Sequence, residues 1–169
     1  MKPDRKIRRR GSSTLEFTLV GIPLIFVLIS TFEMARGMWN YHTIAYAVKE
    51  GTRYASVHGT NCATAPNTCT VTIGQVARQI VNAGIGLPTN QLRLTFTSQS
   101  GAISCWANAC LSNATVWPQS PGNAVGSSIQ IDATYQFQSA ISMFWPGAGS
   151  GSSAGTVTFP ASSREIVQF

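Results

Sequence analysis

The sequence has little of what a catalytic or metal site requires. Its 169 residues include six acidic residues and only two histidines, His42 and His58. It contains neither the G-x-S-x-G turn of serine hydrolases nor the H-E-x-x-H motif of zinc proteases. We therefore predict a protein that is not an enzyme, with no catalytic residue, no metal ligand and no cofactor. An exported enzyme with a reactive pocket is the less favoured alternative, because no set of catalytic residue types supports it.

Charge is scarce beyond the first ten residues. Six of the 12 basic residues precede Gly11, where only Asp4 opposes them. Such a basic segment is typical of an arm that binds nucleic acid or of the flank of a membrane span. Residues 17–32 follow without a charge, and about 20 apolar residues cross the bilayer core. We therefore predict a transmembrane segment over about residues 15–37, with the lipid bilayer and not nucleic acid as its partner.

The position of the basic residues also predicts the orientation in the membrane. Lys and Arg are enriched in the cytoplasmic flanks of membrane spans. Residues 1–11 are therefore expected to form a cytoplasmic leader, and residues 58–169 an exported head. A helix buried in the core of a soluble protein is the alternative, and the basic residues directly upstream argue against it.

Proline is absent between Pro23 and Pro66, so nothing interrupts a helix over this stretch. We predict one helix over about residues 13–57, roughly 65 Å long, whose second half projects beyond the bilayer. An apolar stripe at steps of three and four is expected on its projecting half. The residues of this stripe are Met38, Tyr41, Ala45, Val48, Thr52 and Ala55. Two pairs of opposite charge that support an exposed helix are Glu33 with Arg36 and Glu50 with Arg53.

The exported head carries signals for both helix and strand. Apolar residues at helical spacing predict a short amphipathic helix over residues 73–81, ended by glycines. Alternating apolar and polar residues predict strands at 92–98, 129–137 and 156–159. The expected fold class is α+β, a long helix followed by a short helix and a three- to four-stranded antiparallel sheet.

All four cysteines fall in the expected exported part: Cys62, Cys69, Cys105 and Cys110. An even number of cysteines in an oxidising compartment favours disulfides. Of the three connectivities, we favour Cys62–Cys69 and Cys105–Cys110, because short loops close at the lowest entropic cost. Zinc is a weaker alternative, since the C-x-x-C spacing and the paired histidines of zinc sites are missing.

An acidic residue, Glu16, stands at the start of the apolar run. In one interpretation Ser13 and Glu16 form a capping box that satisfies free N–H groups at the helix start. In the other, the chain is cut after Gly11, and the exposed amine of Ser12 pairs with Glu16 of a neighbouring subunit. The two interpretations are compatible.

The arrangement of Gly11, Ser12 and Glu16 before an apolar run resembles the leaders of type IV prepilins and pseudopilins. A membrane prepilin peptidase cuts these leaders after the glycine, and a glutamate follows at the fifth mature position. The resemblance implies cleavage between Gly11 and Ser12, and a role for Glu16 in assembly.

Residues 11–57 also resemble the N-terminal module of TadE-like proteins, minor pseudopilins of the tight-adherence (Flp) pilus system. The resemblance lies in FEMARGMW at 32–39 and AVKEGTRYA at 47–55, with Lys49 and Thr52 as mild departures from the family pattern. It implies a pilin helix over residues 12–57. It also implies pilus biogenesis and surface adhesion as the function, and a place in the bacterial inner membrane with the head in the periplasm. The implied partners are prepilin peptidase, other pilins and minor pseudopilins, and the inner-membrane assembly machinery. The alternative is an uncut, signal-anchored periplasmic binding or scaffold protein.

Overall fold

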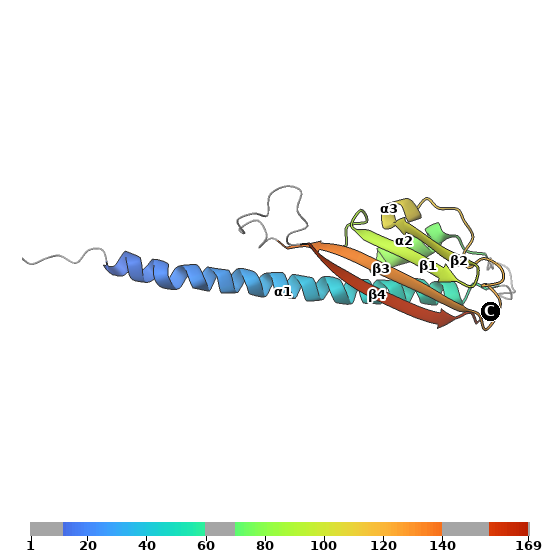
Figure 1. Cartoon of the computed structure of the whole chain (residues 1–169), viewed down its shortest axis with the longest axis horizontal. Helices are drawn as coiled ribbons and strands as arrows, with labels where there is room; N and C mark the ends of the chain where they lie inside the picture. The colour runs from blue at the N-terminus through green and yellow to red at the C-terminus, as the bar shows by residue number, and fades with distance from the viewer. Residues whose placement is uncertain (1–11, 60–69, 140–155, 169) are drawn as a thin grey trace, which may run out of the picture.

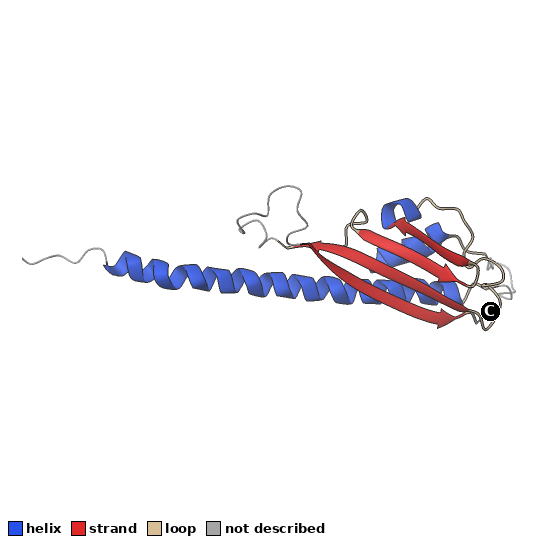
Figure 2. Cartoon of the chain, viewed as in Figure 1, coloured by secondary structure: helices blue, strands red, loops and turns tan. Residues whose placement is uncertain are grey.

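The computed structural model describes residues 12–59, 70–139 and 156–168, and side chains from Thr14 onward. They form one long helix whose C-terminal end lies against a small α+β head, as the sequence predicts (Figures 1 and 2). The elements are α1 (Ser12–Ser56), α2 (Ile73–Ala83), β1 (Leu92–Ser98), β2 (Gly101–Trp106), α3 (Ala107–Cys110), β3 (Ser128–Gln138) and β4 (Thr156–Ile166). The predicted leader and the Cys62–Cys69 bridge lie outside the described residues.

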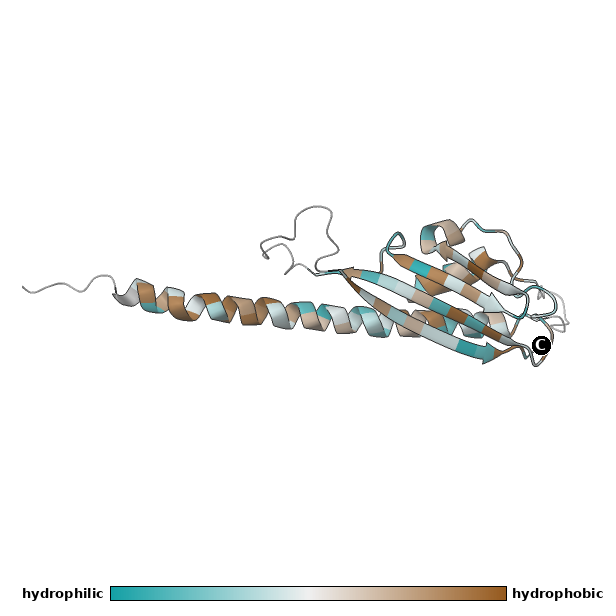
Figure 3. Ribbon diagram, viewed as in Figure 1, coloured by the Kyte–Doolittle hydropathy of each residue, from teal (hydrophilic) through white to brown (hydrophobic). Residues whose placement is uncertain are grey.

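Helix α1 runs for 45 residues without a break and continues through Pro23. Its bounds confirm the helix expected over about residues 13–57. Only the C-terminal part contacts the head, and the apolar N-terminal half extends away from it (Figure 3). The helix therefore divides into an uncovered half and a packed half.

The buried face of α1 differs from the predicted stripe. Val48, Thr52 and Ala55 are buried as expected, whereas Met38, Tyr41 and Ala45 are exposed. The buried residues of α1 are Gly37, Ile44, Ala47, Val48, Gly51, Thr52, Ala55 and Ser56. The prediction was wrong for the first turns because the covered face there lies one position earlier, at Gly37 and Ile44. A glycine packed against Phe159 carries no apolar signal in the sequence.

The four strands form one antiparallel sheet in the order β2-β1-β3-β4. One face is apolar and covers α1 and α2, with Phe96 beside Ile131 and Leu94 beside Ala133 in the register. Strand β2 was not predicted from the sequence, and the strand predicted over residues 156–159 extends to Ile166 as β4. Strand β4 continues through Pro160, which is tolerated because β4 is an edge strand and the missing N–H has no neighbour to bond.

Helix α2 begins at a capping box that the sequence encodes locally. The Gln75 backbone N–H donates to Thr72 Oγ1 (3.3 Å), and the Thr72 N–H donates to Gln75 Oε1 (2.9 Å). Its apolar face, which includes Ile73, Val76 and Ile80, is fully buried against α1 and the sheet. This confirms the predicted amphipathic helix.

Candidate functional site

The first half of α1 exposes apolar side chains that a water-soluble domain would cover. An 18-residue window of this helix is apolar enough to cross a membrane, and none of its residues is buried within the protein. Leu19, Phe17 and Phe32 are each at least three-quarters exposed. Such a surface is compatible with single-pass membrane anchoring, in which lipid and not protein covers the apolar side chains.

The hydroxyl groups of this segment are satisfied within the helix. Ser30 Oγ donates to the Phe26 carbonyl, and Thr31 Oγ1 donates to the Val27 carbonyl, both at 2.8 Å. Thr18 Oγ1 likewise donates to a carbonyl one turn earlier. A hydrocarbon environment offers no partner to a polar group, so internal bonds of this kind suit a membrane segment.

Of the residues predicted for cleavage and assembly, Ser12 and Glu16 lie at the free end of α1, and Gly11 lies outside the described residues. Ser12 is the first residue of the helix, and Glu16 follows one turn later with an exposed side chain. A cap at Ser13 requires the helix to start at Thr14, two residues later than it does. The Ser13 side chain is not described, so the capping box stays a prediction, as does the role of Glu16.

Arg36 joins α1 to the far end of strand β3. Its Nη2 atom lies 3.2 Å from Glu33 Oε2 and donates to the Gln138 carbonyl oxygen at 2.6 Å. The guanidinium carbon lies 4.7 Å from the centre of the Phe137 ring. One side chain therefore makes an ion pair on its own helix, a charged hydrogen bond to a strand end and a cation–π contact.

The second predicted pair, Glu50 with Arg53, does not form an ion pair in the described part of the chain. Sequence spacing found the Glu33–Arg36 pair but not its contact with Gln138, 102 residues away. We name the set Glu33, Arg36, Phe137 and Gln138 the helix–head joint. Tyr135 lies near it on β3: burial raises the pKa of its hydroxyl, and the Arg36 charge offsets this in part.

Loss of the Arg36 side chain is expected to loosen the joint locally. The bond to Gln138 involves a charged donor but is half-exposed, so we expect Arg36→Ala to cost about 1 kcal/mol. Hydrogen exchange at the paired ends of β3 and β4 should then be about five-fold faster. Lys49→Ala removes an exposed cation from the same helix and serves as the control. Equal exchange rates at these strand ends in both variants would show that Arg36 does not stabilise the contact between α1 and the head.

Close packing of α1 on α2 occurs at Gly51. A Cβ atom at this position would overlap Ile80 Cγ1 and lie 2.8 Å from Ile80 Cδ1, both well inside van der Waals contact. At Gly37, by contrast, an added Cβ would meet Phe159 at an ordinary 3.6 Å. The segment 47–55 therefore contains a glycine because α2 crosses α1 at that point.

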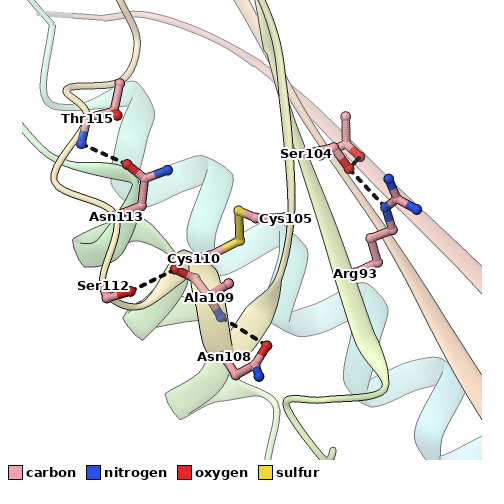
Figure 4. Close-up of a disulfide and its surroundings, with 10 residues drawn as sticks. Arg93, Ser104, Cys105, Asn108, Ala109, Cys110, Ser112, Asn113 and Thr115 are labelled. Atoms are coloured by element: carbon pink, nitrogen blue, oxygen red, sulfur yellow. Dashed lines mark hydrogen bonds between the residues drawn. A yellow bond between two sulfur atoms is a disulfide. The ribbon is translucent and has the colours of Figure 1, made fainter.

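Cys105 and Cys110 are joined in the structure, at the end of β2 and in α3 (Figure 4). Their Cα atoms are 5.6 Å apart, within the usual range for a disulfide. Two sulfur atoms bonded to each other cannot bind zinc as thiolates, so Cys105 and Cys110 do not form a zinc site in this structure. The bridge fixes a turn of the head far from the free end of α1, so the site residues predicted from sequence fall in two separate regions.

Comparison with known proteins relates the long helix to one family. A family model described as TadE-like protein matches residues 11–53, about a quarter of the chain. This agrees with the resemblance found in the sequence and covers the apolar half of α1, Arg36 and Gly51. No curated protein and no solved structure matches the chain.

Proposed function

We propose that this chain is a minor pseudopilin of the tight-adherence (Flp) pilus system, acting in pilus biogenesis and surface adhesion. The observation that carries the proposal is the match of residues 11–53 to TadE-like proteins, on a helix whose apolar half is uncovered. A pilin-like subunit requires a helix that lies in the membrane before assembly and packs with other subunits afterwards. Helix α1 has the length for both tasks, since 45 residues extend for about 68 Å, twice the bilayer core.

In this proposal, prepilin peptidase cuts the chain between Gly11 and Ser12 on the cytoplasmic side of the inner membrane. Glycine has no side chain, so a peptidase can approach the backbone closely there. The new Ser12 amine, with an ordinary pKa of about 7.7–8.0, then pairs with Glu16 of a neighbouring pilin or minor pseudopilin. The head stays in the periplasm, and the inner-membrane assembly machinery moves the subunit.

The helix–head joint supports a mechanical role. Arg36 fixes the strand ends of the head to α1 just beyond the apolar segment, and Gly51 allows α2 to pack tightly on the same helix. A force applied to the helix is therefore transmitted to the head and not absorbed by a flexible linker. The alternative, an uncut signal-anchored periplasmic binding or scaffold protein, requires the same anchor but neither cleavage nor a role for Glu16.

Mass spectrometry of the N-terminal peptide separates the two functions. Protein purified from membranes of cells with an active prepilin peptidase should begin at Ser12. Gly11→Val should leave residues 1–11 attached in nearly all molecules, because the added side chain blocks the scissile bond. Gly21→Ala, which changes a glycine of the same segment away from the cut, should still begin at Ser12. Wild-type protein that retains residues 1–11 would favour the uncut anchor.

A further inference from the structure

A groove of about 960 Å³ lies between α1 and the adjoining ends of strands β3 and β4. Its helix wall includes Phe26, Val27 and Met34, and its opposite wall is formed by Phe137, Val157 and Phe159. These six side chains are apolar, and Val157 is 49% exposed on the edge strand. The head therefore presents an apolar surface toward the uncovered half of the helix.

The groove begins within the predicted membrane segment. Phe26 stands ten residues before Arg36, so it lies about 15 Å along the helix axis from the joint toward the bilayer centre. Phe26 and Val27, which line the groove, belong to the apolar part of α1 that the head does not cover. At that depth, the material available to fill a space beside the helix is hydrocarbon.

The polar side chains of the groove nearest the bilayer centre, Ser30 and Thr31, do not require water; Glu33, Tyr41, His42 and Ser139 also line it. The Ser30 and Thr31 hydroxyls donate to carbonyls of their own helix, as they would in lipid. The charged pair Glu33–Arg36 lies at the outer end of the predicted span, at the level where polar headgroups begin. Tyr41, whose ring packs edge-on against Phe159 at 6.3 Å, has the amphipathic character of residues found at membrane interfaces.

We propose that acyl chains of the phospholipid leaflet that faces the head occupy this groove. The adjoining ends of β3 and β4 then rest in the membrane interface, with Val157 in contact with lipid. The head is held against the bilayer surface and does not stand free above it on a helical stalk. This inference rests on the membrane anchoring of the proposed function.

The proposal favours lipid over a second protein helix because of the continuity of the surface. An acyl chain can reach Phe26 and Val27 directly from the surrounding leaflet, without any specific partner. The same chain can contact Phe159 by extending along the groove toward the head. Removal of Val157 and its neighbours from water is favourable whichever apolar material covers them, so the surrounding leaflet is sufficient and no specific partner is needed.

Fluorescence quenching of the full-length protein in phosphatidylcholine vesicles tests the proposal. An environment-sensitive amino acid such as dansylalanine replaces Val157, Leu28 or Val125 in three separate proteins. Leu28 lies in the predicted span outside the groove, and Val125 is an exposed residue at the opposite end of the 11-residue strand β3, about 30 Å away. A nitroxide on the lipid acyl chain and aqueous iodide are the two quenchers.

The probe at Val157 should be quenched several-fold more by the lipid nitroxide than the probe at Val125, and several-fold less by iodide. Strong iodide quenching at Val157, equal to that at Val125, would place the groove in water and overturn the proposal. Protection of Val157 from both quenchers would show that protein fills the groove, which also overturns it. If Leu28 itself were open to iodide, the membrane anchor would fail, and with it the proposed function.

Discussion

Gly51→Ala protein is expected to be less stable than Gly37→Ala protein by about 1–3 kcal/mol, the usual effect of overpacking a filled core. Both substitutions replace a glycine within α1, so both gain the same helix propensity, about 1 kcal/mol. The difference between them therefore measures the contact of the added methyl group alone. At Gly37 this contact is ordinary, whereas at Gly51 the methyl group overlaps the side chain of Ile80.

Ile80 cannot move aside without a further rearrangement. It is fully buried, and it packs within the core that α1, α2 and the sheet share. The methyl group at position 51 must therefore either push α2 away from α1 or force Ile80 out of its favoured rotamer. Both changes weaken the contact that holds the head on the helix.

A double-mutant cycle separates this clash from other causes. Ile80→Ala removes Cγ1 and Cδ1, the two atoms that the added methyl group would overlap, and alone should cost about 2–5 kcal/mol. Combined with Gly51→Ala, it should cost less than the sum of the two single changes, because the smaller side chain leaves room for the new methyl group. Thermal unfolding of the four proteins in detergent measures the differences, at about 2–4 °C for each kcal/mol. Strictly additive effects would show that the close approach of Gly51 and Ile80 is unimportant.

The elements that the sequence predicts well are those with local signals. A 45-residue helix follows from the absence of proline after Pro23, and α2 follows from apolar residues at helical spacing that end at glycines. Strands β1 and β3 alternate between a buried and an exposed face, so their period of two is visible without knowledge of the fold. These features depend on residues close together in the chain.

The features that the sequence analysis missed depend on long-range contacts. Strand β2 is an edge strand with mostly exposed residues, and its apolar alternation is limited to Ile103 and Cys105, too short a signal to predict a strand; it pairs with β1. The acceptor for Arg36 is the backbone carbonyl of Gln138. Every residue has such a carbonyl, so the sequence does not show which one accepts the bond. Gly51 is part of a recognisable segment, but the side chain that requires a glycine there, Ile80, lies 29 positions further along the chain.

The helix–head joint gives the predicted pair Glu33–Arg36 a second structural role. Glu33 and Arg36 have the spacing of a helix-stabilising ion pair on a solvated face, which contributes a few tenths of a kcal/mol. In the structure the same arginine reaches the head, so Glu33 also orients the side chain that connects the two parts. The pair is thus a local feature with a long-range consequence.

Glu16→Gln protein is expected to be inserted, cleaved and stable, yet to lose crosslinks to other pilins and to support no adhesion. Glutamine keeps the size and much of the hydrogen-bonding capacity of glutamate, so any contribution to the helix start is largely retained. The negative charge is lost, and with it the proposed ion pair to the Ser12 amine of a neighbour. Within the bilayer, water cannot replace that partner, so the subunit amine would be left unpaired.

Two further variants make the result specific to position 16. Glu50→Gln removes a carboxylate from the head-proximal part of the same helix and should leave crosslinking and adhesion unchanged. Glu16→Ala should add a defect at the helix start of about 1 kcal/mol to the loss of assembly. In vivo crosslinking and a surface-adhesion assay, with the N-terminal peptide as a check on cleavage, measure the outcome. Normal pili and unchanged crosslinks in Glu16→Gln cells would limit Glu16 to a local role at the helix start, and the pseudopilin proposal would then depend on cleavage at Gly11.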